Sequence, residues 1–258
     1  MVSVAAVQMT SGGNVGVNLM LAKKLLVRAA ESGAKLVVLP ESFSLFPNNK
    51  ADLLLVSEVL GVGRVQDFLA NFAQEYKVWV VGGTIPIKSN LEQKSYASCI
   101  VWNDKGEQVG CYNKMHLFDV DMPMSGLNQQ ESDSYASGDR SLCIDTPFGK
   151  VGLSVCYDLR FPELYRSLRE QGADILVNSS AFFSSTGRVH WRPLLKARAI
   201  ENQCYMIGAN QVGEHENSRY THGESMIIDP WGKVLASQNV GVGVVMAEID
   251  LNYLSVLR

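Results

Sequence analysis

The sequence lacks any long hydrophobic run and any surplus of basic charge. No apolar stretch approaches the roughly 20 residues of a membrane-spanning helix, and residues 1–14 lack the basic and apolar regions of a secretory signal. Lysine and arginine number 23 against 26 aspartates and glutamates, which gives a net charge of -3 without a basic cluster. We therefore expect a soluble chain that has neither a membrane nor a nucleic acid as its partner.

Cysteine is also scarce. The chain of 258 residues has five, an odd number with wide spacing, which does not suit a disulfide framework. Neither a C-x-x-C nor an H-x-x-x-H pattern occurs, so a zinc site has no support in the spacing. We expect free thiols in a reducing cytoplasm, and neither a metal nor a cofactor. The five are Cys99, Cys111, Cys143, Cys156 and Cys204.

Linkers rich in serine, glycine or proline are absent, so we predict one domain over residues 1–258. What is present is an alternation of short apolar strands with amphipathic helices, which predicts an α/β fold with helices covering sheet faces. The predicted helices span about 18–31, 64–76, 162–170 and 189–202. The predicted strands are 3–9, 35–41, 78–86, 151–156, 174–180 and 204–212, with hairpins at 96–112 and around 229–232.

Three chemically active side chains stand where predicted strands end. Glu41 closes KLVVLPE, Lys114 follows QVGCYN, and Cys156 ends VGLSVC just before a helix that Pro162 can begin. Ligands bind at the carboxyl ends of strands in α/β sheets, and a nearby helix N-terminus favours a thiolate. Each residue alone also fits a purely structural role: the cysteine could be packed in the core, and the charged residues could lie in solvated loops. Spacing does not prove that the three meet.

The same residues carry a family resemblance. LPESF, YNKMHLFDVD and SVCYDLRFPE resemble, in the expected order, the three signature segments of the nitrilase, or carbon-nitrogen hydrolase, superfamily. SSAF, TGRVHW, ARAIENQCY and DPWG are most similar to its Nit amidase branch, especially the deaminated glutathione amidases. The resemblance covers nearly the whole chain and implies a four-layer α-β-β-α sandwich. It also implies a homodimer that hydrolyses a small amide.

The resemblance assigns roles residue by residue. Glu41 is the expected general base, Lys114 the oxyanion stabiliser and Cys156 the nucleophile that forms a thioester. Glu131, in QESDSYASGD, matches the second glutamate of the family, and the backbone N–H of Tyr157 completes the oxyanion hole. Two carboxylates beside one ammonium oppose a standing thiolate. We therefore expect the thiol proton to move to Glu41 during attack.

Three further positions match residues that face the substrate in similar amidases. Arg160, whose guanidinium suits a carboxylate, is joined by Phe182 and Thr186. Each has a structural alternative: an ion pair of Arg160 with Glu163 or Asp158, a core role for Phe182, and a turn role for Thr186.

The identity of the substrate is the least determined part of the hypothesis. Arg188 and the segment HGES at 222–225 depart from the commoner family pattern. An ω-amidase acting on α-ketoglutaramate, an N-carbamoyl hydrolase and a nitrilase therefore stay open. A papain-like enzyme would need His190 or His222 as the base, and a nitrilase-like scaffold without activity would only bind a metabolite or protein.

Overall fold

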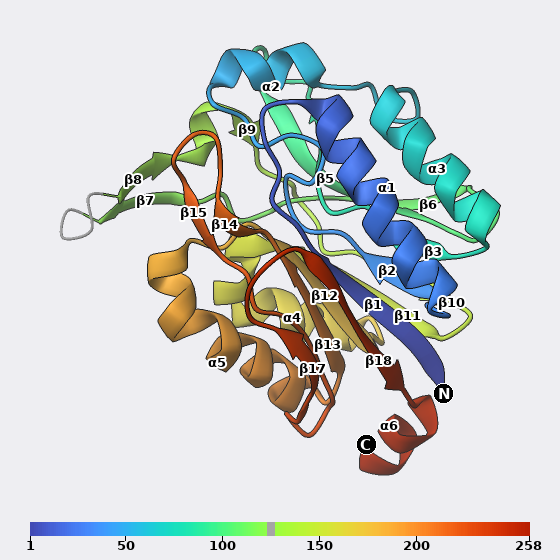
Figure 1. Cartoon of the computed structure of the whole chain (residues 1–258). Coiled ribbons are helices and arrows are strands. Elements are labelled where there is room, and N and C mark those ends of the chain that lie inside the picture. The colour runs from blue at the N-terminus through green and yellow to red at the C-terminus, as the bar shows by residue number, and fades with distance from the viewer. Residues whose placement is uncertain (123–126) are drawn as a thin grey trace.

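Two β-sheets stack face to face, and helices cover the outer face of each (Figure 1). The computed structural model describes residues 1–122 and 127–258. The order of layers is helix, sheet, sheet, helix, so the predicted α/β class and four-layer sandwich are confirmed. In the described part of the chain, no helix is long and apolar enough to cross a membrane.

The first sheet has eight strands in the order β18-β1-β2-β3-β5-β4, with β6 and β9 also paired to β5. The first and last strands of the chain lie side by side, because β1 pairs antiparallel with β18 and parallel with β2. Its strands are β1 (Val2–Gln8), β2 (Leu36–Val38), β3 (Trp79–Val81), β4 (Ile85–Lys88), β5 (Ser95–Trp102), β6 (Gln108–Asn113), β9 (Tyr135–Ala136) and β18 (Gly243–Ile249).

The second sheet has six strands in the order β10-β11-β12-β13-β16-β17. Its three central strands, β11 to β13, are parallel, so their carboxyl ends lie at one edge. Cys156 follows β11 and Ala181 follows β12 at this edge. The strands are β10 (Cys143–Thr146), β11 (Gly149–Val155), β12 (Ile175–Ser180), β13 (Tyr205–Asn210), β16 (Ser225–Ile228) and β17 (Val234–Gln238).

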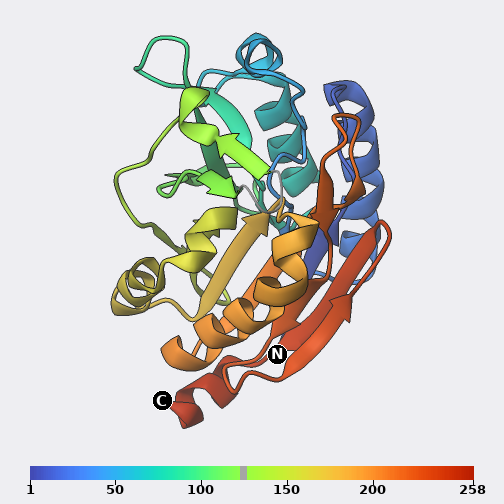
Figure 2. The same ribbon diagram turned by 90° about the vertical axis from the view of Figure 1, so that its left-hand side faces the viewer.

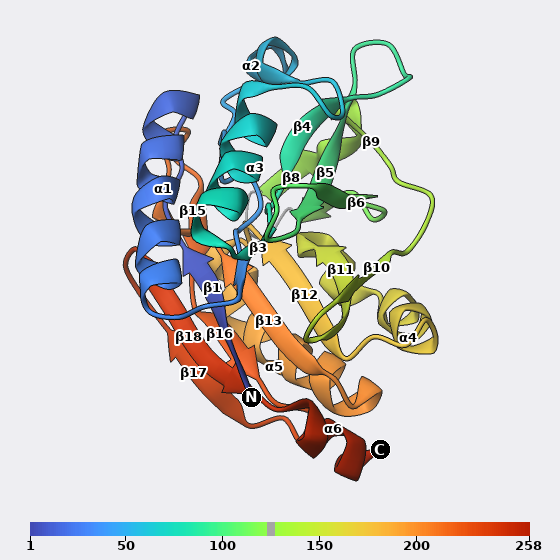
Figure 3. The same ribbon diagram turned by 90° about the vertical axis from the view of Figure 1, so that its right-hand side faces the viewer.

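The central core lies between the sheets and consists of inward-facing aliphatic residues such as Val38, Val155 and Val177, all fully buried. A second apolar layer lies between the first sheet and helices α1 (Val15–Glu31) and α3 (Arg64–Tyr76), which stand in front of it in Figure 3. A third lies under α4 (Pro162–Glu170) and α5 (Ser184–Asn202). The apolar residues that predicted the first helix are all buried: Leu19, Ala22, Leu25, Leu26 and Ala29.

Several short elements have no clear periodic signal in the sequence. Helix α5 begins at Ser184 rather than near Val189, where it was predicted to begin. The prediction missed its first turn because residues 188–190 are exposed and carry no apolar pattern. Two small hairpins project from the same end of the molecule (Figures 1 and 2). They are β7 (Asp119–Met122) with β8 (Leu127–Gln130), and β14 (Val212–Glu214) with β15 (Tyr220–His222); the short helices α2 (Lys50–Val56) and α6 (Leu251–Leu257) were likewise not predicted.

Candidate active site

Glu41 lies where the chain leaves β2 and turns away from the first sheet. Ser42 adopts a left-handed conformation with φ 57°, and its backbone N–H donates to Thr84 Oγ1 at 2.8 Å. The Glu41 carboxylate is 7% exposed, and its Oε2 accepts a hydrogen bond of 2.8 Å from the backbone N–H of Ala181. Glu41 therefore links the end of β2 in the first sheet to the end of β12 in the second.

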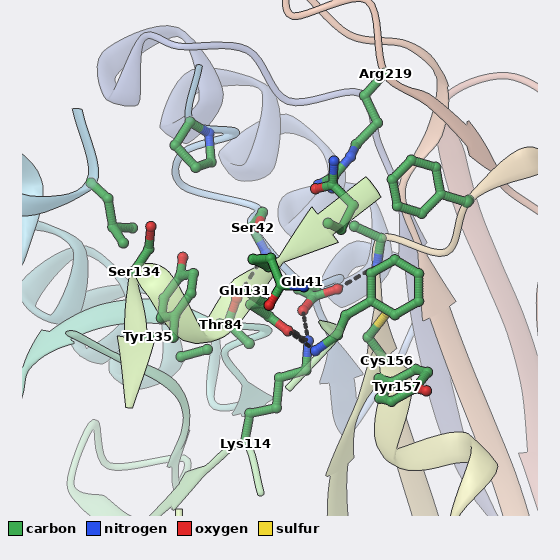
Figure 4. A pocket seen from close by; sticks show the side chains of 18 of the residues that line it. Glu41, Ser42, Thr84, Lys114, Glu131, Ser134, Tyr135, Cys156, Tyr157 and Arg219 are labelled. Atoms are coloured by element: carbon green, nitrogen blue, oxygen red, sulfur yellow. Dashed lines mark hydrogen bonds and ion pairs between the residues drawn. The ribbon is translucent and has the colours of Figure 1, made fainter. Parts of the chain in front are cut away.

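Lys114 follows β6 and places its ammonium between two carboxylates (Figure 4). Its Nζ donates to Glu41 Oε1 at 2.8 Å and to Glu131 Oε2 at 2.8 Å. Burial disfavours the charge on Lys114, but Glu131 and Glu41 outweigh it and raise the pKa of the ammonium well above its usual value. Burial raises the pKa of Glu131, although Lys114 opposes the shift. The three groups form a buried ionic cluster.

Cys156 begins a 3-10 helix, η3 (Cys156–Arg160), directly after β11. Its φ is 45°, a left-handed conformation that is uncommon for any residue other than glycine, asparagine or aspartate. Strain of this kind is found where the surrounding structure must aim one side chain. Figure 4 shows the sulfur beside the ionic cluster formed by Glu41, Lys114 and Glu131.

The environment of Cys156 favours the protonated thiol. Burial is the main cause that raises the pKa of the thiol, the Glu41 carboxylate raises it further, and Lys114 lowers it. The Cys156 thiol interacts with the Glu41 carboxylate and with the backbone N–H of Ala181. This balance agrees with the expectation that the proton leaves only as attack occurs.

The raised pKa gives a testable reactivity. We expect Cys156 in the free enzyme to react with iodoacetamide more slowly at pH 7 than a free cysteine, whose pKa is about 8.5. Since Glu41 contributes to the rise, the Glu41→Gln variant should react faster at the same pH. Mass spectrometry of the peptide that contains Cys156 measures both rates from pH 6 to 10. A rate already at its plateau below pH 6 would contradict the account.

A fully buried aspartate supports the turn that carries Cys156. Asp158 Oδ2 accepts hydrogen bonds from the Tyr112 hydroxyl at 2.6 Å and from the Val155 backbone N–H at 2.8 Å. Its Oδ1 accepts from the His116 backbone N–H at 3.0 Å and lies 2.7 Å from His116 Nδ1. This network joins η3 to the segment after Lys114, so it fixes Cys156 relative to Lys114.

We expect the Asp158→Asn variant to unfold with a free energy about 2–4 kcal/mol below that of the native protein. The amide nitrogen is a donor, and it would face either the Val155 N–H and Tyr112 hydroxyl or the His116 N–H. Urea unfolding followed by circular dichroism measures the change. The matched control is Asp145→Asn, because that side chain is 88% exposed and should change stability little. Equal stability of the two variants would refute the role of the network.

All the predicted site residues border one cavity of about 480 Å³. Glu41, Cys156 and Ala181, which follow β2, β11 and β12, all border it, and the ionic cluster lies against it. The structure thus brings together the eight residues to which the family resemblance assigns a catalytic or substrate-binding role. These are Glu41, Lys114, Glu131, Cys156, Tyr157, Arg160, Phe182 and Thr186.

The predicted substrate-binding residues occupy the wall beside Cys156. Among the described residues, Arg160 has no ion pair with Glu163 or Asp158; its guanidinium lies 5.3 Å from the Phe182 ring centroid, and its Nη1 is 3.2 Å from His190 Nδ1. The ion-pair alternative for Arg160 was therefore wrong. Phe182 is 3% exposed, packs in the core under α5 and borders the cavity, so its core role is observed and its contact with substrate stays a prediction. Thr186 is 8% exposed, in the first turn of α5.

None of the four histidines borders the cavity. His190 lies near Arg160 and His222 near Glu224, so neither is placed as the base of a Cys-His pair. His116 contacts Asp158, and His215 is buried against Phe46. In the parts of the chain that the structure describes, no group of three or more histidine, cysteine or acidic residues could hold a metal ion.

Sequence reasoning missed other residues of the cavity. Arg219, Tyr135 and Phe118 border it, and they come from the loops and short strands around the two projecting hairpins. Nothing in their local sequence pattern marks them, because hairpins this short have no measurable periodicity. The segment HENS at 215–218 indicates a turn just before Arg219, but it does not indicate that Arg219 borders the cavity.

Comparison with known proteins agrees with the geometry. The carbon-nitrogen hydrolase family model matches residues 3–258. Deaminated glutathione amidase of Mus musculus is 42% identical over 99% of this chain and 80% of its own length. The crystal structure of Saccharomyces cerevisiae Nit3, a member of branch 10 of the nitrilase superfamily, superposes with a TM-score of 0.89 at 33% identity, over all of this chain and 93% of that one.

The crystal structure of the Caenorhabditis elegans NitFhit protein gives a TM-score of 0.92 at 36% identity. The match covers 99% of this chain but only 62% of that longer one. Sequence and structure thus lead to the same family along almost the full length of the chain. The chain belongs to the carbon-nitrogen hydrolase family, the nitrilase superfamily.

Proposed function

We propose that this carbon-nitrogen hydrolase is an amidase that cleaves deaminated glutathione through a thioester on Cys156. The observation that carries the proposal is the meeting of Glu41, Lys114 and Cys156 from three strand ends at one cavity. A nucleophile, a base and a cation within one buried cluster are the parts that thiol-dependent amide hydrolysis requires. The solved and curated relatives at 33–42% identity over the full chain support the same chemistry.

In the proposed reaction, the Cys156 sulfur attacks the amide carbonyl carbon while Glu41 accepts the thiol proton. The negative charge that develops on the carbonyl oxygen is stabilised by Lys114 Nζ and the backbone N–H of Tyr157. Glu41 then returns the proton to the departing amine, which leaves an acyl thioester. A water that gives its proton to Glu41 attacks this thioester, releases the acid and restores the thiol.

Glu131 has a positioning role in this mechanism. Both of its carboxylate oxygens accept hydrogen bonds from Lys114 Nζ, at 2.8 and 2.9 Å, and its Oε2 also accepts from the Phe118 backbone N–H at 2.6 Å. Three hydrogen bonds, two to Glu131 and one to Glu41 Oε1, thus fix the position of the ammonium. Glu131 orients Lys114 and keeps it charged.

The proposed substrate follows from the relatives and from the wall beside the nucleophile. The Mus musculus relative is a deaminated glutathione amidase. Deaminated glutathione carries a carboxylate on the acyl side of its scissile amide. The Arg160 guanidinium, four residues after Cys156, borders the cavity and can donate two parallel hydrogen bonds to such a carboxylate. We propose that Arg160, with Phe182 and Thr186, binds this acyl part.

A substrate panel tests the proposal. Deaminated glutathione, α-ketoglutaramate, N-carbamoyl-β-alanine and a simple nitrile are compared by kcat/KM, with the Cys156→Ala variant as control. We expect the highest value for deaminated glutathione. A preference for α-ketoglutaramate would favour an ω-amidase, and a preference for the carbamoyl compound or the nitrile would overturn the proposed substrate.

We further propose that residues 1–258 form one domain that assembles as a homodimer in the cytoplasm. Apolar side chains stand exposed near the C-terminal helix α6, where Trp231 is 73% and Val256 is 87% exposed, as expected of a surface that another subunit covers. All five cysteines are free, which suits a reducing compartment. Light scattering of the purified protein gives the mass that tests the dimer.

A further inference from the structure

A second arginine reaches the cavity from a different part of the fold. Arg219 directly precedes β15 in the projecting β14–β15 hairpin, and Figure 4 shows its side chain pointing into the pocket toward Glu131 and Glu41. Its guanidinium carbon lies 4.3 Å from the ring centroid of Phe183 and 5.6 Å from that of Phe46. The guanidinium also donates a hydrogen bond to Gln129 Oε1 of β8. Two aromatic rings and one side-chain amide therefore hold the Arg219 guanidinium in place.

This guanidinium is half-buried without a carboxylate partner. Among the described residues Arg219 forms no ion pair, and the segment 122–128 beside Gln129 contains no acidic residue. The two carboxylates of the cavity, Glu41 and Glu131, both accept hydrogen bonds from Lys114. Burial lowers the pKa of Arg219, and the nearby carboxylates of Glu41 and Glu131 oppose this shift only in part, so the charge is incompletely compensated. A carboxylate brought by a ligand would offset that cost through a paired, charge-assisted hydrogen bond.

The charge of the whole cavity points in the same direction. The chain has a net charge of -3, yet basic side chains outnumber acidic ones around the cavity. The basic side chains are Lys50, Lys114, Arg160 and Arg219, and the acidic ones are Glu41 and Glu131. Lys114 lies between the two glutamates, so Lys50, Arg160 and Arg219 remain, and among the described residues neither arginine forms an ion pair. A substrate with two carboxylates fits this arrangement better than one with a single carboxylate.

The position of Arg219 relates it to one side of the scissile amide. Arg219 belongs to the projecting β14–β15 hairpin and has exposed neighbours in Ser218 and Tyr220, whereas Arg160 lies on the same short helix as Cys156. The amine must depart before water attacks the thioester, so it has to lie toward solvent. The acyl part stays bound to the Cys156 sulfur, on the same short helix as Arg160.

We propose that Arg219 is a specificity-determining residue that binds a second carboxylate, carried by the leaving amine of the substrate. The inference rests on the proposed thioester chemistry at Cys156 and deepens it by naming the substrate class, an amide with a carboxylate on each side. Deaminated glutathione belongs to this class, because its leaving amine is a dipeptide that ends in a carboxylate. α-Ketoglutaramate does not, because it releases ammonia.

The test compares deaminated glutathione with the same molecule bearing a C-terminal carboxamide. We expect kcat/KM of the native enzyme to favour the acid by about ten- to hundredfold, the range for one hydrogen-bonded charge. The Arg219→Gln variant should lose this preference, while its kcat/KM for α-ketoglutaramate stays within about threefold. Arg219→Lys should retain part of the preference, and the exposed Arg28→Gln is the matched control that should retain all of it.

A purely structural role for Arg219, such as fixing the two hairpins, would lower kcat/KM for the acid, the carboxamide and α-ketoglutaramate together and would overturn the inference. So would an acid preference that survives in Arg219→Gln. Affinities of the acid and the carboxamide for Cys156→Ala, with and without Arg219→Gln, separate this inference from the catalytic proposal. If the native protein hydrolyses neither compound, but Cys156→Ala binds the acid more tightly in a way that depends on Arg219, the inference is supported and the proposed function is refuted. Equal or absent binding of both compounds overturns the inference.

Discussion

The Cys156→Ala variant is expected to lose at least about 10⁴-fold in kcat with deaminated glutathione as substrate. The alanine removes the only thiol that borders the cavity in the described part of the chain, and no histidine is placed to activate a water instead. The change leaves Glu41 paired to Lys114 at 2.8 Å, so the buried cluster and the fold should persist. Steady-state assay of the purified variant measures the loss.

Two controls give the Cys156→Ala result its meaning. The Cys111→Ala variant removes a different partly exposed thiol, located in β6, and should keep near-native kcat. The melting temperature of Cys156→Ala should lie within a few degrees of the native value, because the truncation is small and lies at a cavity. Residual activity above a few per cent of native would show that the thiol is not the nucleophile.

The Lys114→Met variant is expected to lose both stability and activity. Lys114 is 1% exposed, so its removal leaves the buried Glu41 and the mostly buried Glu131 without their shared ammonium partner. Breaking a buried ion pair from one side costs about 3–5 kcal/mol of unfolding free energy. Loss of one oxyanion donor lowers kcat by about 10²–10³-fold. Denaturant unfolding and steady-state kinetics measure the two effects separately.

The stability of Lys114→Met should depend on pH in a definite direction. Burial already raises the pKa of Glu131, and removal of the ammonium that opposes this shift raises it further. A folded carboxyl that keeps its proton above the unfolded pKa of about 4.3 makes stability fall as pH rises. The variant should therefore be less stable at pH 8 than at pH 5, relative to the native protein.

The matched control for Lys114→Met is Lys150→Met, which removes a lysine whose partner Asp145 is 88% exposed. Surface pairs contribute about 0–1 kcal/mol, so this variant should unfold almost like the native protein and keep its activity. If Lys114→Met were as stable and as active as Lys150→Met, the ionic cluster would have neither the structural nor the catalytic importance assigned to it.

Much of the fold was predictable because its larger elements have strong periodicity. The helix α3 has the bounds expected from the apolar spacing, and α4 begins at Pro162 as its fixed φ predicts. The hairpin of β5 and β6 pairs as expected around the turn 103–106. The start of helix α5 and the small hairpins β7–β8 and β14–β15 were harder to predict, because exposed or short segments carry little hydrophobic periodicity.

The candidate site was predictable in its members but not in its geometry. Glu41, Lys114 and Cys156 could be named because each stands at a strand end within a recognisable motif. The left-handed φ of Cys156 and the support from Asp158 depend on packing between distant segments, which no local signal encodes. Arg219 was missed for the same reason, since only the tertiary fold brings its hairpin over the cavity.

The central claim is that Cys156 carries the acyl group of the substrate as a thioester. Rapid quenching of the enzyme with deaminated glutathione, followed by intact-protein mass spectrometry and peptide mapping, tests it most directly. We expect the mass of the bound acyl group on the peptide that contains Cys156, formed and lost at rates compatible with turnover, and absent from Cys156→Ala. Full turnover by an enzyme that never carries this mass, or that carries it on another residue, would contradict the account.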